Sequence, residues 1–151
     1  MWCVVCVARQ IDSQCHADPR STHQRHEALV TSGFVSSPNY PLVYALTTDC
    51  WWTLTVQPTQ TLRLTLYDFQ LTVRTDRLCR DYLRITALTL TSSAPEVTVF
   101  EDCGSVGMQV FDIASSRVQL YFHAEQSSSQ AHRGFLIHYT GPTARHMSTI
   151  A

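Results

Sequence analysis

The sequence contains no lysine, and only 15% of its 151 residues are charged. All 11 basic side chains are arginines, they form no dense run, and the formal net charge is −1. Non-specific binding to nucleic acid depends on many cations that neutralise phosphates, so this composition argues against a nucleic-acid partner. No run approaches the ~18–20 apolar residues that a membrane-spanning helix needs, and we expect no membrane span.

The common catalytic motifs are also absent. The sequence has no GxSxG, HExxH, P-loop or GxGxxG pattern, and Gly104 to Gly107 (GSVG) has the spacing of a turn rather than of a nucleophile elbow. His123 and His138 lie in strand-like segments without an evident serine or cysteine partner. We therefore predict that the chain is not an enzyme.

Cysteine is abundant, with six residues in this length. Their long intervals suit disulfides, which form in secreted proteins, although the sequence does not fix the pairing. Cys3 and Cys6 form a CxxC, which could be a redox pair or, with His23 and His26, a zinc site; neither has the expected sequence context. Residues 1–8 instead resemble the end of a signal peptide. Its removal would leave four cysteines: Cys15, Cys50, Cys79 and Cys103.

From Leu29 onward, apolar and polar residues alternate with the period of half-buried strands. No segment combines a helical period with capping residues, so we predict an all-β antiparallel sandwich. Residues 9–28 form a polar lead-in, and residues 142–151 a tail without a core pattern. The strands are rich in threonine and lack lysine, a residue that normally protects exposed sheet edges. Another segment could therefore cover such an edge or pair with it. The predicted strands are 52–56, 62–66, 82–85, 97–100, 109–113, 118–122 and 135–139, with turns at 36–41, 57–59, 94–95 and 104–107.

Residues 29–141 contain a series of short motifs: a turn motif GFVSSPNYP (33–41), DCWW (49–52), FQL (69–71), CRDYLRI (79–85), CG (103–104) and GFLIHY (134–139). In their residues and their order, these motifs resemble those of the CUB domain family. One motif departs from the family pattern, because it is one residue short between Cys79 and Asp81. The resemblance implies a jelly-roll-like β-sandwich with disulfides Cys79–Cys103 and Cys15–Cys50, with Cys3 or Cys6 as alternative partners of Cys50.

The resemblance also implies a calcium site at one end of the sandwich, which this sequence only partly retains. Asp81 matches one family ligand, but Thr72 stands where a glutamate is expected. Glu125 replaces an aspartate, Ser127 is retained, and Asp76 in a longer preceding loop could compensate. Because Ca²⁺ needs several converging oxygens, we expect weak or no calcium binding.

We expect a secreted, non-catalytic module that binds an extracellular protein through loops at one end of the sandwich. Tyr40 and Tyr44 are candidate contact aromatics on a loop. A second hypothesis is a glycan- or heparin-binding protein, since a basic cluster could bind sulfate, although interleaved acids favour a mixed surface. The cluster consists of Arg74, Arg77, Arg80 and Arg84. A third is an accessory domain of a larger receptor or secreted protease.

Overall fold

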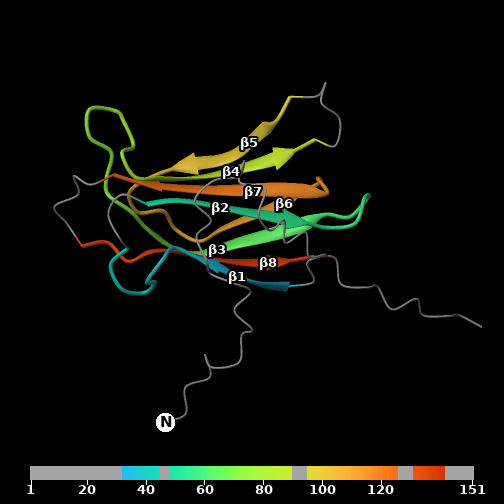
Figure 1. The fold of residues 1–151 in the computed structure, drawn as a ribbon, viewed down its shortest axis with the longest axis horizontal. Coiled ribbons are helices and arrows are strands. Elements are labelled where there is room, and N and C mark those ends of the chain that lie inside the picture. Colours follow the sequence, from blue (N-terminus) through green and yellow to red (C-terminus); the bar gives the residue numbers. More distant parts are fainter. Residues whose placement is uncertain (1–31, 45–47, 90–94, 126–130, 142–151) are drawn as a thin grey trace, which may run out of the picture.

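A computed structural model describes residues 32–44, 48–89, 95–125 and 131–141. These residues form eight strands and no helix (Figure 1). Among them, no helix long and apolar enough to cross a membrane is found. The expected leader, the whole of the polar lead-in and the expected tail lie outside the described residues. The strands are β1 (Ser32–Ser36), β2 (Thr48–Thr55), β3 (Leu62–Gln70), β4 (Tyr82–Leu88), β5 (Val97–Asp102), β6 (Gln109–Ile113), β7 (Arg117–Ala124) and β8 (Gly134–Thr140).

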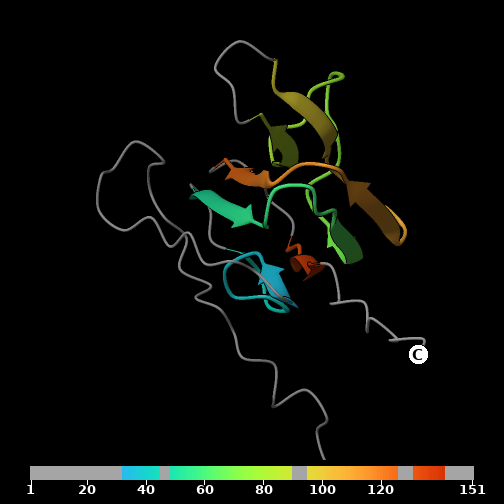
Figure 2. The ribbon, with the colours of Figure 1, turned by 90° about the vertical axis from the view of Figure 1, so that its right-hand side faces the viewer.

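The strands make two four-stranded sheets, seen from the end in Figure 2. One sheet has the order β1-β8-β3-β6, the other has the order β2-β7-β4-β5, and every pairing between these strands is antiparallel. Most hydrogen-bonded neighbours are far apart in sequence, because the chain passes repeatedly from one sheet to the other. The predicted all-β, jelly-roll-like sandwich is confirmed.

The core lies between the two sheets, and the period-2 pattern of the sequence creates it. Along β7, every second side chain is buried, from Val118 to Ala124. Trp51 and Trp52 point to opposite sides of β2, as expected. Trp52 is buried in the core, whereas Trp51 stacks on Tyr121 on the outer face, with ring centroids 4.7 Å apart.

All seven predicted strands are present, and one strand was missed. The sequence assigned residues 33–41 to a turn motif, but Ser32–Ser36 form β1 and the turn comes afterwards. Gly33 allows β1 to approach β8 closely, since a Cβ at this position would lie 2.3 Å from the hydroxyl oxygen of Tyr139. In the turn, Asn39 has a positive φ of 65° and the Tyr40–Pro41 peptide is cis.

One predicted disulfide lies within the described residues. The predicted Cys79–Cys103 disulfide is confirmed and links the segment entering β4 to the end of β5, with Cα atoms 5.6 Å apart. Cys50 in β2 is fully buried and disulfide-bonded. Its expected partner, Cys15, lies outside the described residues, so this pairing stays a prediction.

Candidate functional site

Three chain segments meet at one end of the sandwich, on the left of Figure 1. They are the segment after β1 (residues 37–44), the segment between β3 and β4 (residues 71–81) and the start of the segment after β7 (Glu125). Asp81 lies between them and is only 1% exposed. A buried carboxylate costs free energy unless it is hydrogen-bonded, so its partners decide what this end of the molecule can do.

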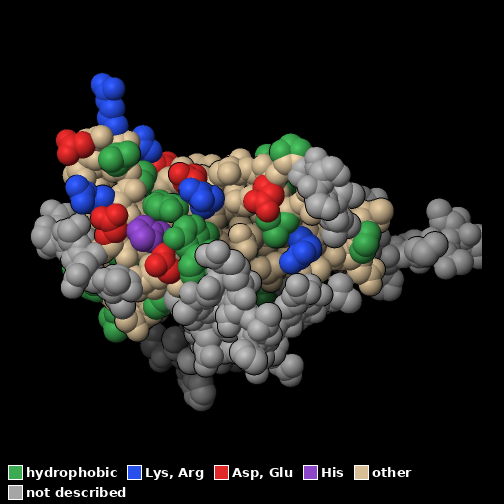
Figure 3. All heavy atoms as spheres, turned by 45° about the horizontal axis from the view of Figure 1, so that its top comes forward, with side chains coloured by type: hydrophobic (Ala, Val, Ile, Leu, Met, Phe, Trp, Pro, Cys, Tyr) green, Lys and Arg blue, Asp and Glu red, His purple; other side chains and the backbone are tan. Residues whose placement is uncertain are grey.

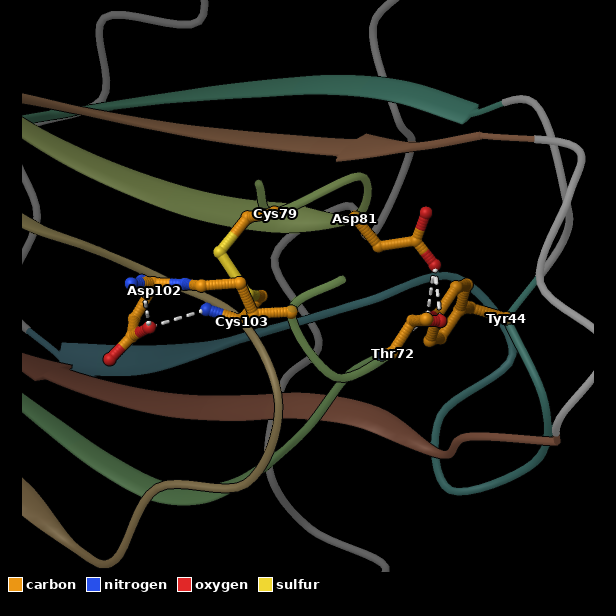
Figure 4. Close-up of a disulfide and its surroundings, with 7 residues drawn as sticks. Tyr44, Thr72, Cys79, Asp81, Asp102 and Cys103 are labelled. Carbon is orange, nitrogen blue, oxygen red and sulfur yellow. Dashed lines mark hydrogen bonds and ion pairs between the residues drawn. A yellow bond between two sulfur atoms is a disulfide. The ribbon is translucent and has the colours of Figure 1, made fainter. Parts of the chain in front are cut away.

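The Asp81 carboxylate accepts hydrogen bonds from all three segments. The Tyr44 hydroxyl donates to Asp81 Oδ2 over 2.6 Å, and the Thr72 hydroxyl donates to the same oxygen over 2.8 Å (Figure 4). Asp81 Oδ1 accepts the backbone N–H of Glu125 at 2.8 Å. Both carboxylate oxygens are thus satisfied within the chain, and one side chain ties three segments together.

Tyr44 is buried, so the prediction that it is an exposed contact residue is wrong. It is 2% exposed, and its ring packs edge-on against Phe122 in the core. Burial and the hydrogen bond to Asp81 raise the pKa of Tyr44 to about 12. The residue is structural because its ring fills the end of the core while its hydroxyl binds the buried carboxylate.

Tyr40, the other proposed contact aromatic, is half-buried. Its hydroxyl donates to Asp68 Oδ2 at 2.8 Å, and Arg133 pairs with the same carboxylate. Desolvation and the hydrogen bond to Asp68 raise the pKa of Tyr40 to about 12. Tyr40 therefore anchors the segment after β1 and stays partly exposed.

The described residues do not fit a Ca²⁺ site. Thr72 lies beside Asp81, as the resemblance implies, but it supplies a hydroxyl in place of a carboxylate. The side chain of Glu125 instead approaches Arg80 at 3.5 Å and His123 at 3.9 Å. Asp76 is exposed at the tip of the hairpin formed by residues 75–78.

Only one group of three potential metal ligands converges in the described part of the chain: Cys79, Asp102 and Cys103. Two of these residues form the disulfide, so they offer no thiolate to a metal. Ser127, the remaining ligand that the resemblance implies, lies outside the described residues. The described donors thus supply one buried carboxylate that is already fully hydrogen-bonded, whereas Ca²⁺ takes about six to eight oxygens.

The four clustered arginines do not form a purely basic patch. Arg74 pairs with Asp102 at 3.4 Å, Arg80 pairs with Glu125, and Arg84 pairs with Glu101. Arg77 is exposed at the hairpin tip, where its φ is positive. Figure 3 shows acidic and basic side chains interleaved on one face of the molecule, and the ion pairs above give the arginine cluster the same mixed character.

A surface feature that the sequence analysis missed lies on the segment after β1. Leu42 is 72% exposed and its neighbour Val43 is also exposed. Both line a shallow, open depression of about 510 Å³ together with Pro41, Gln70 and His132. The sequence gives one sign of this surface: two apolar residues follow each other in a predicted loop. They are not part of an alternating strand pattern that would place them in the core.

Among known protein families, a family model described as CUB domain matches residues 25–139. Signal peptide, CUB and EGF-like domain-containing protein 2 from Homo sapiens is 30% identical over 109 residues, which are 72% of this chain and 10% of that protein. A cubilin homolog from Drosophila melanogaster is 31% identical over 98 residues, which are 64% of this chain and 2% of that protein. The chain thus spans a small part of the length of these curated relatives.

Solved structures show the same fold. The MASP-1 CUB2 domain bound to Ca²⁺ has a TM-score of 0.60 and 22% identity, covering 74% of this chain and 94% of that chain. The CUB1-EGF-CUB2 domain of human MASP-1/3 has a TM-score of 0.63 and 20% identity, covering 76% of this chain and 40% of that chain.

Proposed function

The chain belongs to the CUB domain family, and on this premise we propose that it is a secreted, non-catalytic module that binds another protein through the loops around Asp81. CUB domains are generally non-catalytic and typically act as extracellular protein-interaction modules. The relatives support a role beside other domains, since the name of the human one includes EGF-like domains and the match covers 10% of its length.

The observation that carries this proposal is the hydrogen bonding of Asp81. Because its carboxylate binds Tyr44, Thr72 and the backbone of Glu125, the three segments are held in place before a partner arrives. A preorganised surface loses less conformational entropy on binding than a flexible one. No step of this preorganisation needs a metal ion, so we propose that binding does not depend on calcium.

The surface available to a partner combines apolar and charged groups. Leu42 and Val43 border the open depression, and the Arg133–Asp68 ion pair lies next to it. Apolar residues surrounded by charged ones are typical of protein-binding patches. We propose that an apolar side chain of the partner enters this depression.

The experiment is a surface-plasmon-resonance screen of the chain against a panel of extracellular protein domains, carried out in chelator. We expect at least one binder, whose affinity falls about tenfold or more in Leu42→Ser because an interface contact of roughly 1.4 kcal/mol or more is lost. Val97→Ser in β5 is the matched control, since Val97 is another exposed apolar residue but lies on a strand. The absence of any binder, or a binder that Leu42→Ser leaves unaffected, would contradict the proposal.

A further inference from the structure

In the part of the chain that the structure describes, the strand β6 (Gln109–Ile113) stands at the end of its sheet, with no neighbouring strand on one edge. Among the described residues it pairs only with β3, and no other backbone hydrogen bond is made by its residues. An open edge carries a row of N–H and C=O groups that only another extended strand can satisfy completely. The chemistry of the edge therefore specifies the occupant as an extended polypeptide.

The edge of β6 lacks the features that normally prevent such pairing. Its register with β3 runs without a shift from Leu62–Ile113 to Leu66–Gln109. The strand has no lysine or proline, and its single charged residue, Asp112, already pairs with Arg63 of β3 at 2.7 Å. Edges without a bulge, a lysine or a proline are the ones that proteins usually protect by other means.

One edge strand of the other sheet, β5, is protected. Its register with β4 shifts between Ile85 and Thr86, so Val99 has no direct partner in β4. Two acidic residues, Glu101 and Asp102, end the strand. A bulge and charged side chains both oppose the addition of a further strand.

The outer face beside the β6 edge carries exposed apolar side chains next to the Arg63–Asp112 ion pair. Val110 is 52% exposed, and Met108 and Tyr67 are exposed near it. Val110 begins a row of side chains that crosses the whole sheet. Val110 lies opposite Thr65 of β3, which lies opposite His138 of β8, which in turn lies opposite Phe34 of β1. On the side of the core, Phe111 contacts Phe100 of β5 with ring centroids 5.4 Å apart, which holds β6 in place.

We propose that β6 is a homodimer interface, at which the β6 strands of two copies pair antiparallel about a two-fold axis. A second copy supplies an occupant that matches the edge, namely a strand with the same unshifted register and the same exposed apolar residues, Met108 and Val110. With Val110 on the axis, Gln109 lies opposite Phe111 and Met108 lies opposite Asp112 of the other copy. No like charges meet, because each Asp112 keeps its own Arg63.

The test is the mass of the chain in solution, measured by sedimentation velocity up to concentrations on the order of 100 µM. We expect the wild-type chain to reach twice the mass of one chain. Val110→Lys should raise the dimer Kd about tenfold or more, because the charge lies at the centre of the interface. Val97→Lys is the matched control, since Val97 is 55% exposed on the protected edge of β5, and it should leave the mass unchanged.

Amide hydrogen exchange of the wild-type chain provides a second measurement that needs no variant. Amides of β6 should become more protected as the concentration rises, whereas amides of β5 should not. A wild-type chain that stays monomeric over the whole range overturns the proposal. A dimer that survives Val110→Lys, or that Val97→Lys disrupts equally, overturns it as well. None of these results affects the proposed binding through the loops around Asp81, because its test measures a partner's affinity for Leu42→Ser.

Discussion

At the scale of single residues, Asp81 decides how the loop end of the sandwich is built. Replacement by alanine would leave the hydroxyls of Tyr44 and Thr72 and the N–H of Glu125 without their acceptor. A buried donor left without an acceptor costs up to about 3 kcal/mol, and such costs do not simply add. We therefore expect Asp81→Ala to lower the free energy of unfolding by roughly 2–4 kcal/mol. Urea denaturation followed by tryptophan fluorescence measures this loss.

Two further variants make this prediction specific. Tyr44→Phe keeps the ring in the core and removes one donor, so the loss should be smaller, about 1 kcal/mol. Asp112→Ala removes an exposed carboxylate whose only described partner is Arg63, and it should resemble the wild type. Equal losses in Asp81→Ala and Asp112→Ala would show that the loop end does not depend on the buried carboxylate.

At the scale of elements, the packing of β1 against β8 depends on Gly33. A methyl group there would collide with the Tyr139 hydroxyl, which lies 2.3 Å from the position of the added Cβ. We expect Gly33→Ala to destabilise the fold by about 1–3 kcal/mol, because Tyr139 is buried and has little room to move. Gly107→Ala is the control, since nothing lies within 4 Å of its Cβ. A lower melting temperature in Gly33→Ala alone would support this account.

The strands could be predicted from the sequence because alternation records which side of each strand is buried. The strand β1 was missed because a turn motif overlaps it, and only its pairing with β8 identifies it as a strand. The burial of Tyr44 depends on Asp81, which is 37 positions away in the sequence. The acidic partner of Arg84 likewise follows from strand register, because Arg84 and Glu101 lie opposite each other on β4 and β5. Such long-range pairings have no local pattern.

At the scale of the whole molecule, we predict that Thr72 determines whether the loop end responds to calcium. In the wild type, the hydroxyls of Thr72 and Tyr44 occupy Asp81 Oδ2, so we expect the same melting temperature in millimolar calcium and in chelator. Thr72→Glu should place a second carboxylate beside Asp81, as the family pattern has it. In chelator this variant should be less stable, because two carboxylates in a partly buried site repel each other.

Calcium should reverse this loss, because a cation that bridges the two carboxylates binds only the folded state. At a free calcium concentration of about 100 times its Kd, the gain is about 2.7 kcal/mol. Thr53→Glu adds the same charge at an exposed position on β2 and should not respond. A rise in the wild-type melting temperature in calcium would contradict this prediction. It would mean that a metal ion, and not the hydroxyls of Tyr44 and Thr72 and the N–H of Glu125, holds the three segments together. Equal responses of Thr72→Glu and Thr53→Glu would place the effect of calcium outside the Asp81 site.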